Sequence, residues 1–166
     1  MNLPRLIATV LGTGYLRPAP GTWGSALAVV LAYLLALAGG PWLLTAATVL
    51  AAGLGLWAAT ELLKDSADRD PSEVVIDEVA GQFLALLPVV FGAAGHPEVS
   101  LLALWPGWVV GFLAFRLFDI WKPWIIGRAD ARGDALGLMA DDLLAGIAAG
   151  VVVMLSAGVY HGLMGL

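Results

Sequence analysis

Residues 22–63 read TWGSALAVVLAYLLALAGGPWLLTAATVLAAGLGLWAATELL, and Glu61 is the one charged side chain in this stretch. A helix needs about 20 mostly apolar residues to cross the hydrocarbon core of a bilayer. The stretch is long enough for two such helices, and Gly39-Gly40-Pro41 near its middle is typical of a break between helices. It therefore predicts two membrane helices, Thr22–Ala38 and Trp42–Leu63, joined by a tight turn.

Three more apolar segments follow: Val79–Ala94, Val99–Phe118 and Leu143–Leu163. The chain is 60% hydrophobic and 13% charged with a mean hydropathy of +0.90, whereas soluble domains are about half apolar and a quarter charged. We expect an all-α fold, a polytopic membrane helix bundle with about four to five embedded helices. No linker, low-complexity tract or repeat divides the sequence, so residues 1–166 are expected to form a single domain.

Two of the segments, Thr22–Ala38 and Val79–Ala94, are short for a complete crossing. We expect them to lie in a thinned bilayer or inside the bundle. Pro88 is expected to kink or break the second, because proline removes a helical hydrogen bond.

The charges provide an independent test of this topology. If the chain crosses at every segment, residues 1–21, 64–78 and 119–142 share one side of the membrane. All eight Lys and Arg residues lie on that side or at a helix end that faces it, and so do twelve of the thirteen acids, with Glu98 the exception. Basic residues in short loops mark the cytoplasmic side, so we expect an active site that opens to the cytoplasm.

The composition also excludes several classes of protein. Without Cys, the chain has no disulfide, no thiolate metal site and no cysteine nucleophile. A net charge of −5 without a basic cluster excludes nucleic acid as a partner, because such binding requires Lys and Arg on several phosphates. His96 and His161 fall on the side opposite the other ionisable residues, which disfavours a histidine nucleophile.

The first of three polar segments is the Gly/Pro-rich loop GTGYLRPAPGTWGS, residues 12–25, which leads directly into a helix. Backbone N–H groups at a helix start, together with the hydroxyls of Thr22 and Ser25, can bind a phosphate, so Gly21, Thr22 and Ser25 are candidate substrate-binding residues. The alternative, that Thr22 or Ser25 only caps the helix, remains open.

The second polar segment places Asp77-Glu78 at the boundary of an apolar span. Carboxylates there are costly unless they are paired, solvated or bound to cations, although a negatively charged helix start stabilised by the helix dipole is an equal alternative. The charges just before it, at Asp65, Asp68, Arg69 and Asp70, are interpreted as a solvated loop.

The third polar segment carries Arg116, Asp119 and Lys122 at spacings of three, which would align them as one stripe on a continuing helix that Pro123 then ends. It closes with Asp141-Asp142 at the head of the last span. An ion-paired triad and a charged helix start are the simpler alternatives.

Together the three helix ends present five carboxylates and two cations to a common opening. Hard oxygen ligands of this kind suit Mg²⁺ bridged to substrate phosphates, and two cations suit phosphate oxygens. The five carboxylates are Asp77, Glu78, Asp119, Asp141 and Asp142, and the two cations are Arg116 and Lys122.

These segments resemble the phosphatidylglycerophosphatase A family of Mg²⁺-dependent phosphatases of the bacterial inner membrane. The resemblance runs through nearly the whole chain and rests on Pro20-Gly21-Thr22-Trp23-Gly24-Ser25, Ile76-Asp77-Glu78 with Gly81, Phe115-Arg116 with Asp119, Trp121-Lys122-Pro123-Trp124, and Gly137 with Asp141-Asp142 and Ala145-Gly146. It implies hydrolysis of phosphatidylglycerophosphate to phosphatidylglycerol and inorganic phosphate, a step of phospholipid biosynthesis. It also implies a metal site formed by Asp77, Glu78, Asp119, Asp141 and Asp142, and substrate binding by Arg116 and Lys122. The expected catalytic residues are Asp77, Glu78, Asp119, Arg116 and Lys122.

The main alternative is a phospholipid head-group transferase, which also uses Mg²⁺ at membrane-boundary aspartates. Its pattern Asp-Gly-x-x-Ala-Arg followed by Gly-x-x-x-Asp-x-x-x-Asp is absent, because Asp130-Ala131-Arg132 and Asp141-Asp142 have different spacing. A transporter would require polar residues deep within the spans, which contain nearly none.

Two pairs of glycines, Gly107-x-x-x-Gly111 and Gly146-x-x-x-Gly150, predict close helix packing.

Overall fold

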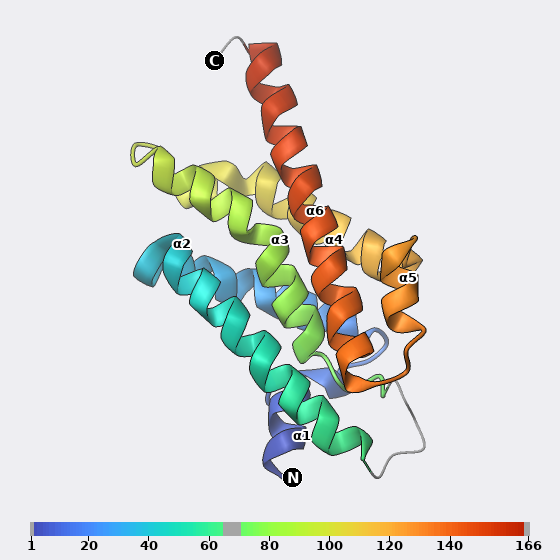
Figure 1. Ribbon diagram of the computed structural model, residues 1–166. Helices are drawn as coiled ribbons and strands as arrows, with labels where there is room; N and C mark the ends of the chain where they lie inside the picture. Colours follow the sequence, from blue (N-terminus) through green and yellow to red (C-terminus); the bar gives the residue numbers. More distant parts are fainter. Residues whose placement is uncertain (1, 65–70, 165–166) are drawn as a thin grey trace.

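The computed structural model describes residues 2–64 and 71–164. Its elements are α1 (Leu3–Ala8), the 3₁₀ turn η1 (Thr13–Tyr15), α2 (Pro20–Leu63), α3 (Ile76–Gly95), the 3₁₀ turn η2 (Leu101–Leu104), α4 (Trp105–Trp121), α5 (Ile125–Asp130) and α6 (Ala135–Met164). No strand occurs in these two ranges, so the predicted all-α fold is confirmed (Figure 1).

Within the described residues, four helices are long and apolar enough to cross a membrane: α2, α3, the continuous η2–α4 segment, and α6. The longest, α2, is divided by non-helical backbone at Gly39 and Gly40. Gly40 has φ 64° and ψ −157°, a conformation that only glycine adopts readily. The chain reverses there, so α2 is a hairpin of two limbs (Figure 1), which confirms the predicted break.

The third segment is longer than expected and is not broken at Pro88, while the alternative of a kink there stays a prediction. Helix α3 has 20 residues, enough for a full crossing, because it begins at Ile76, immediately before the acidic pair. It continues through Pro88 without interruption. A Cβ on Gly150 of α6 would lie 3.5 Å from the Pro88 ring, so the proline is packed against a neighbouring helix.

The expected start of the last span at Leu143 is also wrong, because α6 begins eight residues earlier, at Ala135. The preceding residue, Asp134, accepts a hydrogen bond at Oδ1 from the Gly137 N–H at 2.7 Å. A carboxylate in this position satisfies a backbone donor of the first turn and fixes the helix start.

Helix α3 packs against α2, α4 and α6, and glycines set the closest approach. A Cβ on Gly146 would collide with the Gly81 carbonyl, and one on Gly81 would lie 2.5 Å from the Asp142 carbonyl oxygen. On α4, a Cβ on Gly111 would come within 2.8 Å of Leu86. The predicted packing role of these glycines is confirmed, and the α3–α6 crossing lies directly beside the acidic residues.

Candidate active site

A cavity of about 450 Å³ opens where the starts of α2, α3 and α6 meet the end of α4. Its walls are Ala19, Pro20, Gly21, Ser72, Val74, Asp77, Glu78, Arg116, Asp119, Lys122, Asp130, Gly133, Asp134, Leu138, Asp141 and Asp142. The three polar segments therefore meet in one pocket, at the end of the bundle remote from the C-terminus (Figure 1).

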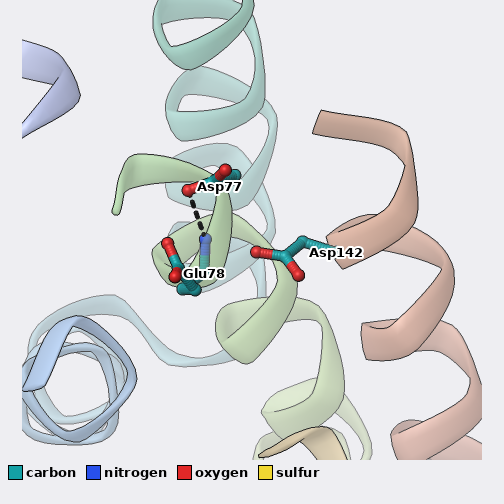
Figure 2. A group of neighbouring side chains, drawn as sticks. All are labelled: Asp77, Glu78 and Asp142. Carbon is teal, nitrogen blue, oxygen red and sulfur yellow. Dashed lines mark hydrogen bonds between the residues drawn. The ribbon is translucent and has the colours of Figure 1, made fainter. Parts of the chain in front are cut away.

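Three carboxylates form a buried group in this pocket. Asp77 and Glu78 lie in the first turn of α3, and Asp142 projects from α6 toward them (Figure 2). One oxygen from each lies within 4.8 Å of the other two. Asp77 and Asp142 are 6% and 3% exposed, so water screens their mutual repulsion poorly.

The local hydrogen bonds do not neutralise this group. The Asp77 Oδ1 atom accepts the Glu78 N–H at 3.0 Å, while the buried Glu78 Oε2 has no hydrogen-bond partner among the described residues. Buried carboxylates are stable only when they are protonated, paired or bound to a cation. Three convergent hard oxygens fit a divalent cation such as Mg²⁺ or Ca²⁺, so the cluster could bind a metal ion.

The Arg116 guanidinium lies beside this group but is itself paired. Its Nη1 atom is 2.5 Å from Asp119 Oδ2, with both side chains largely buried, and it donates a hydrogen bond to the Ser25 hydroxyl at 3.3 Å. Arg116 Nε is buried without a partner among the described residues. The cation is thus fixed at the wall of the cavity with unused hydrogen-bonding capacity.

Lys122 forms the second cationic contact. Its ammonium group donates to Asp130 at 2.5 Å and to Asp141 at 2.6 Å. Burial by itself lowers the pKa of Lys122, but the two carboxylates outweigh it and hold the pKa above its usual value. Lys122 therefore stays charged at neutral pH.

The predicted continuous stripe of Arg116, Asp119 and Lys122 is not formed as expected. Helix α4 ends at Trp121, and Lys122 adopts a left-handed backbone conformation with φ 48° as its C-cap. This turn directs the Lys122 side chain to the end of α5 and to α6, where its carboxylate partners Asp130 and Asp141 lie.

The start of α2 meets the same pocket. A Cβ on Gly21 would collide with the Glu78 carboxylate and come within 3.2 Å of Arg116, so a larger residue there would displace these two side chains. Ser25 is fully buried and donates its hydroxyl to the Gly21 carbonyl at 2.8 Å, whereas Thr22 is not a wall residue. The capping alternative is wrong, because Ala19 is the N-cap and no side chain caps the helix.

The acidic pairs differ in their place on the helices. Asp77-Glu78 lies in the first turn of α3, where the helix dipole favours negative charge. Asp141-Asp142 lies two turns inside α6, whose first turn has no acid, so the charged-helix-start interpretation is wrong for this pair. The solvated-loop interpretation of residues 65, 68, 69 and 70 falls outside the described residues.

Sequence reasoning missed four polar residues at or beneath this site. Ser72, Asp130 and Asp134 line the pocket, but the sequence places them only in the segments 64–78 and 119–142 between the spans and gives them no role. Gln82, one turn after Glu78, is fully buried, and neither of its amide atoms has a partner in the described structure. The available signal was a polar side chain inside an apolar span, which is costly unless it has a role.

Fold and pocket together define a polytopic membrane protein with a buried acidic site at one end of its helices. The sequence profile of the phosphatidylglycerophosphatase A family matches residues 6–157. The chain therefore belongs to the phosphatidylglycerophosphatase A family, and the expectation drawn from its motifs is confirmed.

Individual relatives agree with this assignment. A Haemophilus influenzae protein named phosphatidylglycerophosphatase A is 34% identical, over 92% of this chain and 88% of its own. The Escherichia coli protein of the same name is 32% identical, over 89% and 80%. A Bacteroides thetaiotaomicron protein provisionally named phosphatidylinositol-3-phosphatase is 37% identical, over 87% of each chain. No solved structure matches. The predicted class of enzyme, a phosphatase, is confirmed.

Proposed function

We propose that this enzyme hydrolyses phosphatidylglycerophosphate to phosphatidylglycerol and inorganic phosphate, with Mg²⁺ bound at the acidic pocket. The chemistry replaces the phosphorus–oxygen bond to the lipid glycerol with a bond to a water oxygen, and the leaving oxygen takes up a proton. The family and its named relatives support the reaction, and the pocket supplies the groups that it requires.

The charge balance of the pocket is the observation that carries the proposal. Seven carboxylates and only two cationic side chains line it. A phosphate monoester carries about two negative charges near neutral pH, so the pocket repels it unless cations are bound there. Mg²⁺ when bound would reduce this repulsion, polarise the phosphoryl group and lower the pKa of a bound water.

Each side chain then has a distinct task. Asp77, Glu78 and Asp142 would hold the ion. Arg116 and Lys122 neutralise the phosphate oxygens, since fixed cations stabilise the charge that develops in the transition state. Asp119 and Asp141, the other expected ligands, are paired with these two cations and orient them.

The start of α2 provides a further part of the phosphate-binding site. Gly21 and its neighbour Thr22 expose first-turn backbone N–H groups, which have no acceptor inside the helix. Because Gly21 adjoins both Glu78 and Arg116, this helix start is suited to bind a phosphate oxygen or the bridging phosphodiester. Ser25 supports it by holding Arg116 in place.

We further propose that the protein lies in the bacterial inner membrane with the pocket facing the cytoplasm. The support is the concentration of Lys and Arg in the segments around the pocket, which marks the cytoplasmic side of membrane proteins. The substrate would enter from the inner leaflet, with its phosphate in the pocket and its acyl chains among the helices.

Phosphate release from the purified, detergent-solubilised protein tests the reaction. We expect release from phosphatidylglycerophosphate with Mg²⁺ and none above background with excess chelator; equal rates in both would refute the assignment. Asp77→Asn and Asp119→Asn should lose activity, while Glu98→Gln, a matched loss of charge in an exposed loop, should keep it. Retained turnover in Asp77→Asn and Asp119→Asn would show that these two carboxylates are not needed for catalysis.

The name of the Bacteroides thetaiotaomicron relative motivates a second candidate substrate, phosphatidylinositol 3-phosphate. It offers the same chemistry, a phosphate monoester on a lipid head group, with a bulkier sugar-like ring. Comparing kcat/KM for the two lipids in the same detergent distinguishes them. We expect the glycerophosphate head group to be preferred, and a higher value for the inositol lipid would reassign the substrate.

A further inference from the structure

A second cavity, of about 290 Å³, lies between the first limb of α2 and helix α4. It is lined by six apolar residues: Ala26, Val29, Trp108, Val109, Phe112 and Leu113. No charged or hydroxyl side chain is among them. We call this cavity the α2–α4 groove.

The groove lies along the same two helices as the active-site pocket, farther from the pocket end of the bundle. On α2, Gly21 lines the pocket and Val29 the groove; on α4, Arg116 lines the pocket and Trp108 the groove. Each pair is eight residues apart, which corresponds to about 12 Å along a helix axis. Both helices therefore lead from the phosphate-binding end to the groove over the same distance.

The far end of the groove is held rigidly. Trp108 is 8% exposed and donates its indole N–H to the Leu101 carbonyl at 3.0 Å. Its ring also meets Tyr33 edge to face, with centroids 5.8 Å apart. By contrast, Val109 and Leu113 are 44% and 58% exposed, so the side of the groove faces outward, where a lipid could enter.

We propose that the α2–α4 groove binds one acyl chain of the lipid whose phosphate occupies the pocket. The inference rests on the proposed function and adds the position of the chain. Lipid tails are as apolar as the helix surface, so the groove gains little hydrophobic energy in a membrane. Its effect is positional, because a chain held there fixes the head group relative to Arg116 and to the carboxylates of Asp77, Glu78 and Asp142. Small displacements of the reacting phosphate lower the rate by large factors.

The test fills the groove with a bulky ring and varies the length of the substrate chains. Val29→Trp and Val109→Trp occupy the groove from its two sides, and Val30→Trp is the matched control, because Val30 is 55% exposed and lies outside the groove. Phosphate release is measured with dioleoyl and dihexanoyl phosphatidylglycerophosphate, the short chains being able to reach the pocket without filling the groove.

We expect Val29→Trp and Val109→Trp to lower kcat/KM for the dioleoyl lipid by about tenfold or more, with the dihexanoyl value changed less than about twofold. Val30→Trp should leave both values near wild type. Equal losses on both lipids, or no loss on either, would overturn the proposal. Release of phosphate from neither lipid by wild-type protein would refute the proposed function instead.

A second measurement tests whether the groove binds the acyl chain, and it does not depend on catalytic activity. Phosphatidylglycerophosphate with a diazirine at the middle of one acyl chain is photolysed on the wild-type protein, and the labelled peptides are mapped. We expect label on the groove residues of α2 and α4, and less when phosphatidylcholine carries the same chain. Equal labelling by both lipids, or label elsewhere, would show that the groove contacts only bulk lipid and would overturn the inference.

Discussion

At the residue scale, the carboxylates around the pocket differ in what neutralises them. Asp119 and Asp141 each have a cationic side chain within 2.6 Å, whereas the trio of Asp77, Glu78 and Asp142 has no such ion pair in the described structure. Removing a paired acid frees a cation, while removing a member of the trio relieves repulsion. The two kinds of substitution should therefore differ in their effect on stability.

Asp142→Asn tests this distinction. Activity should fall by about 100-fold or more, because one of three anionic ligands is lost from an ion worth several kcal/mol to the transition state. With chelator present, the melting temperature should rise, since fewer buried like charges remain. Initial rates and thermal unfolding with and without Mg²⁺ measure both effects. A variant as active as wild type would remove Asp142 from the site.

Gln82 gives a second prediction at this scale. It is fully buried, and both amide atoms lack partners. Leaving such groups unsatisfied costs about 1–3 kcal/mol, so Gln82→Met, of similar shape, should raise the melting temperature of the chelated protein. Gln82→Glu, which adds a charge beside Glu78, should lower it. A lower melting temperature in Gln82→Met would mean that a buried water satisfies the amide.

At the scale of elements, the crossing of α3 over α6 assembles the acidic trio. Gly81 and Gly146 let the two backbones touch, and this contact places Asp142 opposite the first turn of α3. The geometry of the site therefore depends on residues that carry no functional group. Small residues at helix crossings have this general role in membrane proteins.

Gly146→Ala should consequently impair both stability and activity. The added methyl group meets the Gly81 carbonyl and forces the helices apart, a strain that typically costs about 1–3 kcal/mol. Gly158→Ala on the same helix is the control, because its Cβ would meet nothing within 4 Å. Melting temperature and phosphate release should fall in the first variant and stay near wild type in the second. Equal behaviour would mean that α6 moves freely against α3.

At the scale of the whole molecule, orientation in the membrane decides which leaflet supplies the substrate. The chain has no Cys, so a single introduced thiol reports its own location. Ser72 lies in the loop at the pocket and Ser100 in the loop after α3, and both are exposed. Since α3 separates them, they mark its two ends.

In intact bacterial cells, a membrane-impermeant maleimide should label Ser100→Cys and not Ser72→Cys. After the cells are opened, both should be labelled, which controls for accessibility. The expectation follows from the excess of Lys and Arg beside the pocket. Labelling of Ser72→Cys in intact cells would place the pocket on the outer face and contradict the proposed use of the inner leaflet.

The sequence by itself determined the helical membrane fold, the break at Gly39-Gly40 and the gathering of the polar segments at one end. Hydrophobic length and glycine conformation are local properties, and the sidedness of charge follows from counting crossings. The family could be recognised from short motifs because these are also local features of the sequence.

Only the tertiary structure decided how the site is divided. Asp142 joins Asp77 and Glu78, while Asp141 beside it turns to Lys122, because neighbouring residues on a helix point in directions about 100° apart and meet different helices. The early start of α6 and the left-handed turn at Lys122 set those directions. Spacing along the chain cannot reveal which carboxylates meet across helices, since that depends on packing between distant segments.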